Sequence, residues 1–253
     1  MAFTARRVHY GHYALHGELD LELSRFVSQF VSKFVDAYVA NSLVDTGKCY
    51  VTTLPSIEEM KAVTKRYYGE EMAFAGFSAV YDPGDEKYIF VCLEACGFDC
   101  PIYAVATFFH ECVHVAIKMI NYDRPGFEDY VARYSLNFIQ ACKRFLMEGG
   151  FGDKEAENMV SYYMNEPLEF FVDCTVASST RIIPEFFTYD VPGQAIYGGL
   201  RKFVVTQPAL YNLVNRTIDV SRLRRIVIRL KPGFNNALQE LGRKVASLYG
   251  RTL

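Results

Sequence analysis

The stretch 101–121 (PIYAVATFFHECVHVAIKMIN) constrains the fold more than any other part of the chain. Pro101 is a favoured first residue of a helix, and Asn121 with the following Arg124-Pro125-Gly126 marks its end. Apolar residues occur on nearly every side of this predicted helix. A helix that is apolar all round has to be buried, so other elements must cover it on several sides.

The same stretch contains His110-Glu111-Cys112-Val113-His114, an H-E-x-x-H pattern. On a helix, positions four apart lie on one face, so the two imidazoles can hold one metal ion. Glu111 then points to the open side, where a bound water can be deprotonated. A chain with 5 His and 29 acidic residues has such a pattern by chance roughly 0.01 times. The competing interpretation is a pair of core histidines satisfied by hydrogen bonds.

A catalytic zinc usually has three protein ligands, so a third must come from elsewhere. The extended motif H-E-x-x-H-x-x-G-x-x-H is absent, because Ile117 and Ile120 stand where its glycine and third histidine would be. Two other groups remain open as metal sites, one in the N-terminal segment and one near the predicted hairpin: His9, His12 and His16, and Cys92, Cys96 and Cys100. For each of them, ordinary packing is the favoured interpretation.

A third ligand is predicted in the segment 162–173 (YYMNEPLEFFVD). Here the chain resembles the zincin metallopeptidases, in the branch whose third zinc ligand is a glutamate on a following helix. An acidic residue four positions later is typical of that branch, and Glu169 with Asp173 has this spacing. Glu166 is the rival, but Phe170 follows it at the same distance. The local run is most similar to the corresponding helix of anthrax lethal factor, and small phage metallopeptidases are comparable in size.

The resemblance implies a Zn²⁺ ion held by His110, His114 and Glu169, with Glu111 as general base. It also implies that Asp173 accepts a hydrogen bond from a zinc-bound imidazole. Tyr162 and Tyr163 precede the ligand helix, where a family tyrosine stabilises the oxyanion. Packing is the alternative role for both tyrosines. The two motifs cover about a quarter of the chain, and they say little about residues 1–70 or 180–253.

The fold class predicted from these patterns is α+β, a mostly helical zincin-like domain with a small antiparallel or mixed sheet. Strands are predicted at 74–81 and 87–94, joined by a turn at 82–85, and a further strand at 221–230. Residues 181–220 contain many Pro and Gly and are predicted to be mostly loop with short elements. We expect residues 1–180 to form the catalytic domain, with 181–253 packed on it. Helices are predicted at 21–40, 56–68, 101–121, 127–147, from 153 to a break near 165, from 167, and at 233–249.

Composition and charge limit the partners. With 51% hydrophobic residues, the chain is not intrinsically disordered, and it has no apolar run long enough to span a membrane. Residues 201–253 hold 11 Lys+Arg and 2 Asp+Glu, a net of +9, whereas residues 1–200 carry −11, which together give the total of −2. The basic section is predicted to pack on the acidic body or to contact an acidic partner or assembly. Nucleic-acid binding is not favoured, because no recognition motif is present.

Seven cysteines and the absence of a secretory signal predict a cytoplasmic or intracellular protein, or a virion component if the chain is viral. The favoured function is a zinc-dependent peptidase acting on a protein or peptide substrate. By analogy with the family fold, an edge of the hairpin sheet would bind an extended peptide. The alternative is a structural or assembly protein, such as a virion component, with a vestigial or structural metal.

Overall fold

The computed structural model describes residues 40, 49–82, 86–96, 101–179, 192–217 and 236 of the 253-residue chain. Most of these residues are helical, and they include one three-stranded mixed sheet. The predicted α+β class is therefore confirmed. Among the described helices, none has both the length and the apolar character needed to cross a lipid bilayer.

The sheet has the strand order β1-β3-β2. Its strands are β1 (Cys49–Leu54), β2 (Gly76–Asp82) and β3 (Glu86–Cys92). β2 and β3 pair antiparallel, as the hairpin prediction required, and β1 pairs parallel to β3 with Cys49 opposite Lys87. The sequence did not predict β1, whose partner lies far along the chain. The sheet is thus mixed, with β3 in the middle.

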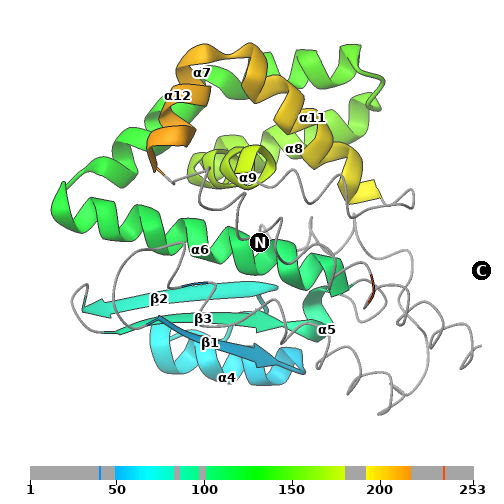
Figure 1. Ribbon diagram of the computed structural model, residues 1–253. Helices are drawn as coiled ribbons and strands as arrows, with labels where there is room; N and C mark the ends of the chain where they lie inside the picture. Colours follow the sequence, from blue (N-terminus) through cyan, green and yellow to red (C-terminus); the bar gives the residue numbers. More distant parts are fainter. Residues whose placement is uncertain are drawn as a thin grey trace, which may run out of the picture.

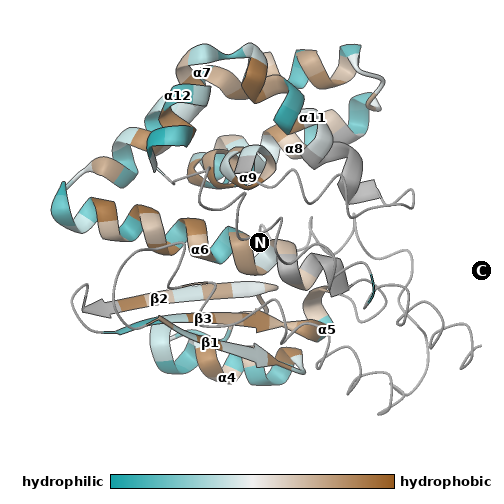
Figure 2. Cartoon of the chain, in the orientation of Figure 1, coloured by the Kyte–Doolittle hydropathy of each residue, from teal (hydrophilic) through white to brown (hydrophobic). Residues whose placement is uncertain are grey.

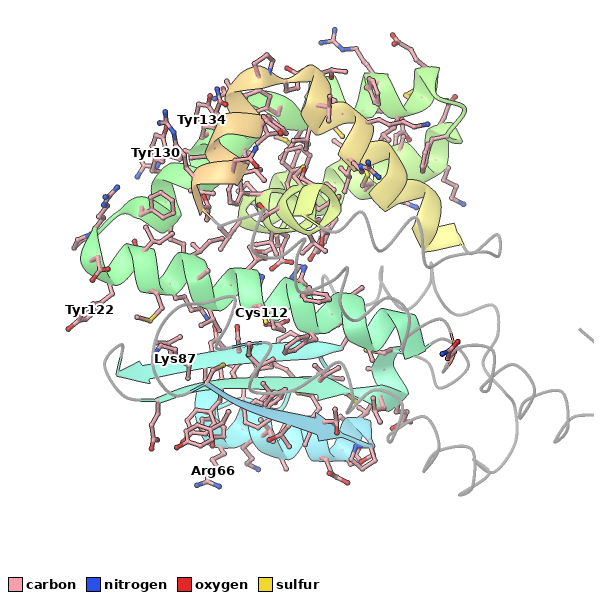
Figure 3. The ribbon with its side chains drawn as sticks, viewed as in Figure 1. Arg66, Lys87, Cys112, Tyr122, Tyr130 and Tyr134 are labelled. Atoms are coloured by element: carbon pink, nitrogen blue, oxygen red, sulfur yellow. The ribbon has the colours of Figure 1, made fainter. Side chains whose placement is uncertain are left out.

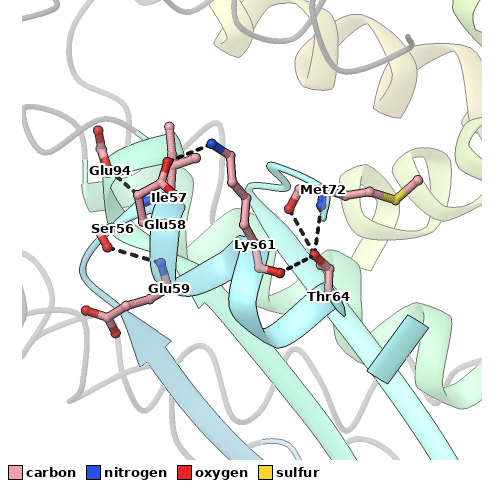
Figure 4. Close-up of polar contacts among 8 residues, drawn as sticks. All are labelled: Ser56, Ile57, Glu58, Glu59, Lys61, Thr64, Met72 and Glu94. Atoms are coloured by element: carbon pink, nitrogen blue, oxygen red, sulfur yellow. Dashed lines mark hydrogen bonds and ion pairs between the residues drawn. The ribbon is translucent and has the colours of Figure 1, made fainter. Parts of the chain in front are cut away.

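Helix α4 (Ile57–Tyr68) connects β1 to β2 and covers one face of the sheet (Figure 1). It begins where predicted, because the Ser56 side chain accepts a hydrogen bond from the Glu59 N–H at 3.2 Å. The Glu94 carboxylate accepts a second bond, from the Ile57 N–H at 2.7 Å. Figure 4 shows both contacts. Glu94 lies in the short helix α5 (Leu93–Cys96), so this bond joins the start of α4 to the end of β3.

Helix α6 (Pro101–Asp123) covers the opposite face of the sheet, over β2 and β3. Alternate side chains of β3 point to the two faces. Ile89 and Val91 belong to the core cluster that includes α6, whereas Phe90 belongs to the cluster around Met60 of α4. Figure 3 shows Cys112 of α6 and the fully buried Lys87 of β3 between the helix and the sheet.

A layer of helices covers the other side of α6. It consists of α7 (Phe127–Glu148), α8 (Asp153–Asn165), α9 (Pro167–Ser179), α11 (Pro192–Thr206) and α12 (Pro208–Thr217). Helix α9 is central, because it contacts α6 and each of the other four, and its residues 170–178 are buried. Figure 2 shows hydrophobic residues along α6 and β3 inside the molecule, and hydrophilic residues on the outer surfaces of α7 and α12. The apolar helix α6 is therefore enclosed between the sheet and α9.

The prediction of mostly loop at 181–220 is wrong for residues 192–217, which form α11 and α12. Both helices begin with a proline, which suits the first turn of a helix. Several predictions fall outside the described residues. These are the helix at 21–40 apart from residue 40, the turn at 83–85, Cys100, the strand at 221–230, the helix at 233–249 apart from residue 236, and His9, His12 and His16.

Candidate metal centre

Two histidines on neighbouring turns of α6 form one half of the site. His110 is 2% exposed, and the side chain of His114 is 13% exposed. Their Nε2 atoms lie 3.0 Å apart, with the two ring centroids separated by 4.8 Å. The spacing of four residues thus places both imidazoles on the same side of the helix, as predicted, and directs both Nε2 atoms to one point.

Glu169 on α9 completes the cluster. Its Oε2 lies 2.9 Å from Nε2 of His110, and its Oε1 lies 3.0 Å from Nε2 of His114. Helix α9 begins at Pro167, so Glu169 lies in its first turn, where the helix dipole favours a negative charge. Glu166, the rival ligand, is exposed and ends α8. Within the described part of the chain, the His110–His114–Glu169 group is the one cluster of three or more such side chains that could hold a metal ion.

The electrostatics of Glu169 favour its charged form. Burial raises the pKa of this carboxyl, but the charge of His110 and hydrogen bonds from both imidazoles outweigh that effect. The net result is a pKa held well below its usual range. A carboxylate that stays ionised in a mostly buried position can ligate a cation.

The atoms of the cluster lie close enough together to share one metal ion. With one ligand atom taken from each residue, all three lie within 4.8 Å of one another. Ligand atoms at 2.0–2.1 Å from a tetrahedral zinc lie about 3.3 Å from one another. Each imidazole Nε2 faces a different oxygen of Glu169, His110 facing Oε2 at 2.9 Å and His114 facing Oε1 at 3.0 Å.

The hydrogen bond to Asp173 shows which nitrogen of His110 faces the cluster. Asp173, one turn after Glu169, places Oδ1 2.9 Å from Nδ1 of His110. An ionised carboxylate cannot donate, so Nδ1 carries the hydrogen of this bond. Nε2 of His110 therefore faces the carboxylate of Glu169 and the Nε2 of His114. Either a proton, as in the hydrogen bonds that lower the pKa of Glu169, or a metal ion can lie between these atoms.

Glu111 lies on α6 directly after His110, but its carboxylate is not part of the three-residue cluster. It is 6% exposed and lies under the first residue of β2, Gly76. A Cβ atom at Gly76 would be 2.6 Å from Oε1 of Glu111 and 2.5 Å from Cγ2 of Thr107. The absence of a side chain at Gly76 therefore lets β2 pass close over the Glu111 carboxylate. Gly76 was not predicted from the sequence, because its close contact is with Glu111, a residue far away in the chain.

The two tyrosines predicted to stabilise an oxyanion occupy different environments. Tyr163 is 2% exposed, and its hydroxyl donates a hydrogen bond to Oδ2 of Asp173 at 2.8 Å. Tyr162 is partly buried, and its ring contacts that of Tyr163 at 5.3 Å between centroids. The Tyr163 hydroxyl therefore binds Asp173 on the Nδ1 side of His110. For Tyr162, the oxyanion role stays a prediction.

The cysteine alternative does not converge on one point within the described residues. Cys92 belongs to the core cluster next to α4, whereas Cys96 belongs to the cluster around α6. The Sγ atom of Cys96 lies 3.6 Å from the Thr107 hydroxyl and 3.7 Å from the Ala75 carbonyl oxygen. These two thiols therefore contribute to packing on different sides of the sheet.

No family model, no curated protein and no solved structure matches this chain. The function of the chain is therefore inferred from the geometry of four side chains, those of His110, His114, Glu169 and Asp173.

Proposed function

We propose that this protein is a zinc-dependent metallopeptidase that hydrolyses peptide bonds in a protein or peptide substrate. The observation that carries the proposal is the convergence of His110, His114 and Glu169 from two helices, with Asp173 bonded behind His110. Two imidazoles and one carboxylate are the ligand set of many catalytic zinc sites, which leave a fourth position open.

A bound zinc ion would lower the pKa of a water molecule and polarise the carbonyl of the peptide bond. Residues of the chain would orient the metal ligand and transfer the proton. Asp173 fixes the orientation of the His110 ring through Nδ1. Glu111, on the same helix as the two histidines, would take the proton of the attacking water and pass it to the leaving amine.

The first experiment measures zinc per chain by elemental mass spectrometry, in the wild type, Glu169→Ala and Glu166→Ala. Glu166 is a matched control, because it is exposed and lies three residues before the proposed ligand. We expect about one zinc per chain in the wild type. Glu166→Ala should retain it, and Glu169→Ala should lose most of it. A wild type that takes up no metal would contradict the proposal.

A second measurement in the same experiment separates a peptidase from a structural zinc protein. Glu111→Gln removes the general base but preserves the size of the side chain. We expect this variant to hold zinc as the wild type does and to lose cleavage of a peptide library. If the wild type holds zinc and cleaves no member of the library, the assembly role becomes the better proposal.

A further inference from the structure

The carboxylate of Asp173 joins two helices through its two oxygens. Oδ1 accepts from Nδ1 of His110 on α6 at 2.9 Å, and Oδ2 accepts from the hydroxyl of Tyr163 on α8 at 2.8 Å. All three side chains are buried, with exposures of 2% for His110, 5% for Asp173 and 2% for Tyr163. The result is a continuous chain of hydrogen bonds, from Tyr163 through Asp173 to His110.

Tyr163 lies on the far side of His110 from the metal cluster. The imidazole presents Nδ1 to Asp173 and Nε2 to Glu169, and the tyrosine hydroxyl donates to the first of these partners. The ring of Tyr163 packs edge-on against Phe170, with 5.2 Å between centroids. The hydroxyl is thus placed to act on the site through Asp173.

The bond between Tyr163 and Asp173 is important because a buried carboxylate needs several hydrogen-bond donors. An ionised carboxylate offers about four acceptor positions, and an unsatisfied one costs free energy in a buried environment. The Tyr163 hydroxyl satisfies the oxygen that His110 does not use. It also opposes rotation of the Asp173 carboxylate, which would carry Oδ1 away from Nδ1.

We infer that Tyr163 is a positioning residue of the metal centre, which orients the His110 ligand through Asp173. The inference rests on the proposed function and assigns Tyr163 a role different from oxyanion stabilisation. It specifies which tyrosine controls the affinity for the metal. Loss of a partner directly behind a ligand weakens metal binding by about 10–100-fold. Because Tyr163 lies one hydrogen bond further from the metal than Asp173 does, we expect the low end of this range, a loss of zinc affinity of about tenfold.

The test is a double-mutant cycle with zinc affinity as the readout. The four proteins are the wild type, Tyr163→Phe, Asp173→Asn and the double variant, titrated with Zn²⁺ in competition with a chromophoric chelator. Tyr163→Phe removes the hydroxyl and preserves the ring against Phe170. Tyr134→Phe is the matched control, because Tyr134 is a partly buried tyrosine on α7 that stacks with Tyr130 on the outside of the helical layer.

We expect Tyr163→Phe to weaken zinc binding about tenfold in the wild-type background and to have little effect in the Asp173→Asn background. The control should bind zinc as the wild type does. An equal loss in both backgrounds would mean that Tyr163 acts through general stability, and no loss in either would mean that it does not act on the site. Both results would overturn the inference and leave the proposed function intact. A wild type that binds no zinc would overturn both.

Discussion

At the scale of single residues, the contact between Gly76 and Glu111 leads to a direct prediction. In Gly76→Ala, the new methyl group would overlap Cγ2 of Thr107 and the side chain of Glu111, so the carboxylate has to move. A displaced catalytic group lowers kcat by about 10–100-fold. If Glu111 is the general base, as proposed, we expect this loss with the zinc content unchanged, because the three atoms nearest to a Cβ at Gly76 belong to Thr107 and Glu111 and not to the proposed ligand histidines.

Gly198→Ala is the matched control for this substitution. A Cβ at Gly198 meets nothing within 4 Å outside its own helix. Cleavage of the same library peptide and zinc content should both stay at the wild-type level. If Gly76→Ala also cleaves at the wild-type rate, Glu111 does not depend on the close approach of β2.

The residues of the site were predictable from the sequence to different degrees. His110 and His114 follow from the helical repeat alone, since positions four apart share a face. Glu169 and Asp173 were selected through the resemblance to the zincin metallopeptidases, in which an acidic residue typically follows the ligand glutamate by four positions. Gly76 and the bond of Tyr163 to Asp173 were not predictable, because each depends on contacts between separate elements that no local pattern encodes.

At the scale of elements, Lys118 joins α6 to the outer strand of the described sheet. The N–H of Cys92 donates to the Ala75 carbonyl, so residues 75, 77 and 79 bond to β3, and the carbonyl of Ser78 points away from it. The ammonium group of Lys118 donates to that carbonyl at 3.0 Å. Lys118 thus satisfies the backbone acceptor of Ser78, a residue that is 5% exposed.

We predict that Lys118→Met destabilises the protein, because the Ser78 carbonyl loses its donor in a buried position. Loss of a charged hydrogen bond should lower the free energy of unfolding by about 1.5–3 kcal/mol, as measured by denaturant titration.

Lys143→Met is the control for Lys118→Met, because Lys143 makes a 3.5 Å contact with the exposed carboxylate of Glu157 on the helical side of the molecule. Its effect on unfolding should be within about 1 kcal/mol. Similar losses in the two variants would show that the Ser78 contact has no special role.

The elements that the sequence did not predict have physical explanations. Residues 192–217 contain Pro192, Gly198, Gly199 and Pro208, which locally favour loops. Yet both prolines stand at the start of a helix, and Gly199 allows close packing, because a Cβ there would lie 2.3 Å from Cδ2 of Leu146 on α7. β1 was missed because it pairs in parallel with a distant segment, Cys49 lying opposite Lys87, which is 38 residues further along the chain, so no hairpin signal marks it.

At the scale of the whole molecule, the proposed metal would link α6 to α9, and α9 contacts every other helix of its layer. A ligand that binds only the folded chain stabilises it, by about 2.7 kcal/mol when its concentration is 100 times its Kd. Thermal unfolding of the wild type should therefore shift to lower temperature when zinc is removed with a chelator.

Glu169→Ala should melt at the same temperature with and without zinc, and Glu166→Ala should respond as the wild type does. A wild type whose melting temperature is insensitive to the chelator, at a protein concentration where zinc content is known, would contradict a metal that links the two helices.

The position of α9 along the chain also has a consequence during synthesis. His110 and Asp173 are 63 residues apart, and Glu169 lies between them. A ribosome releases the H-E-x-x-H helix well before the helix that supplies the third ligand and the orienting carboxylate. The nascent chain can therefore hold its two histidines for some time without a complete centre. The proposed centre is therefore complete only after the ribosome has added Glu169 and Asp173.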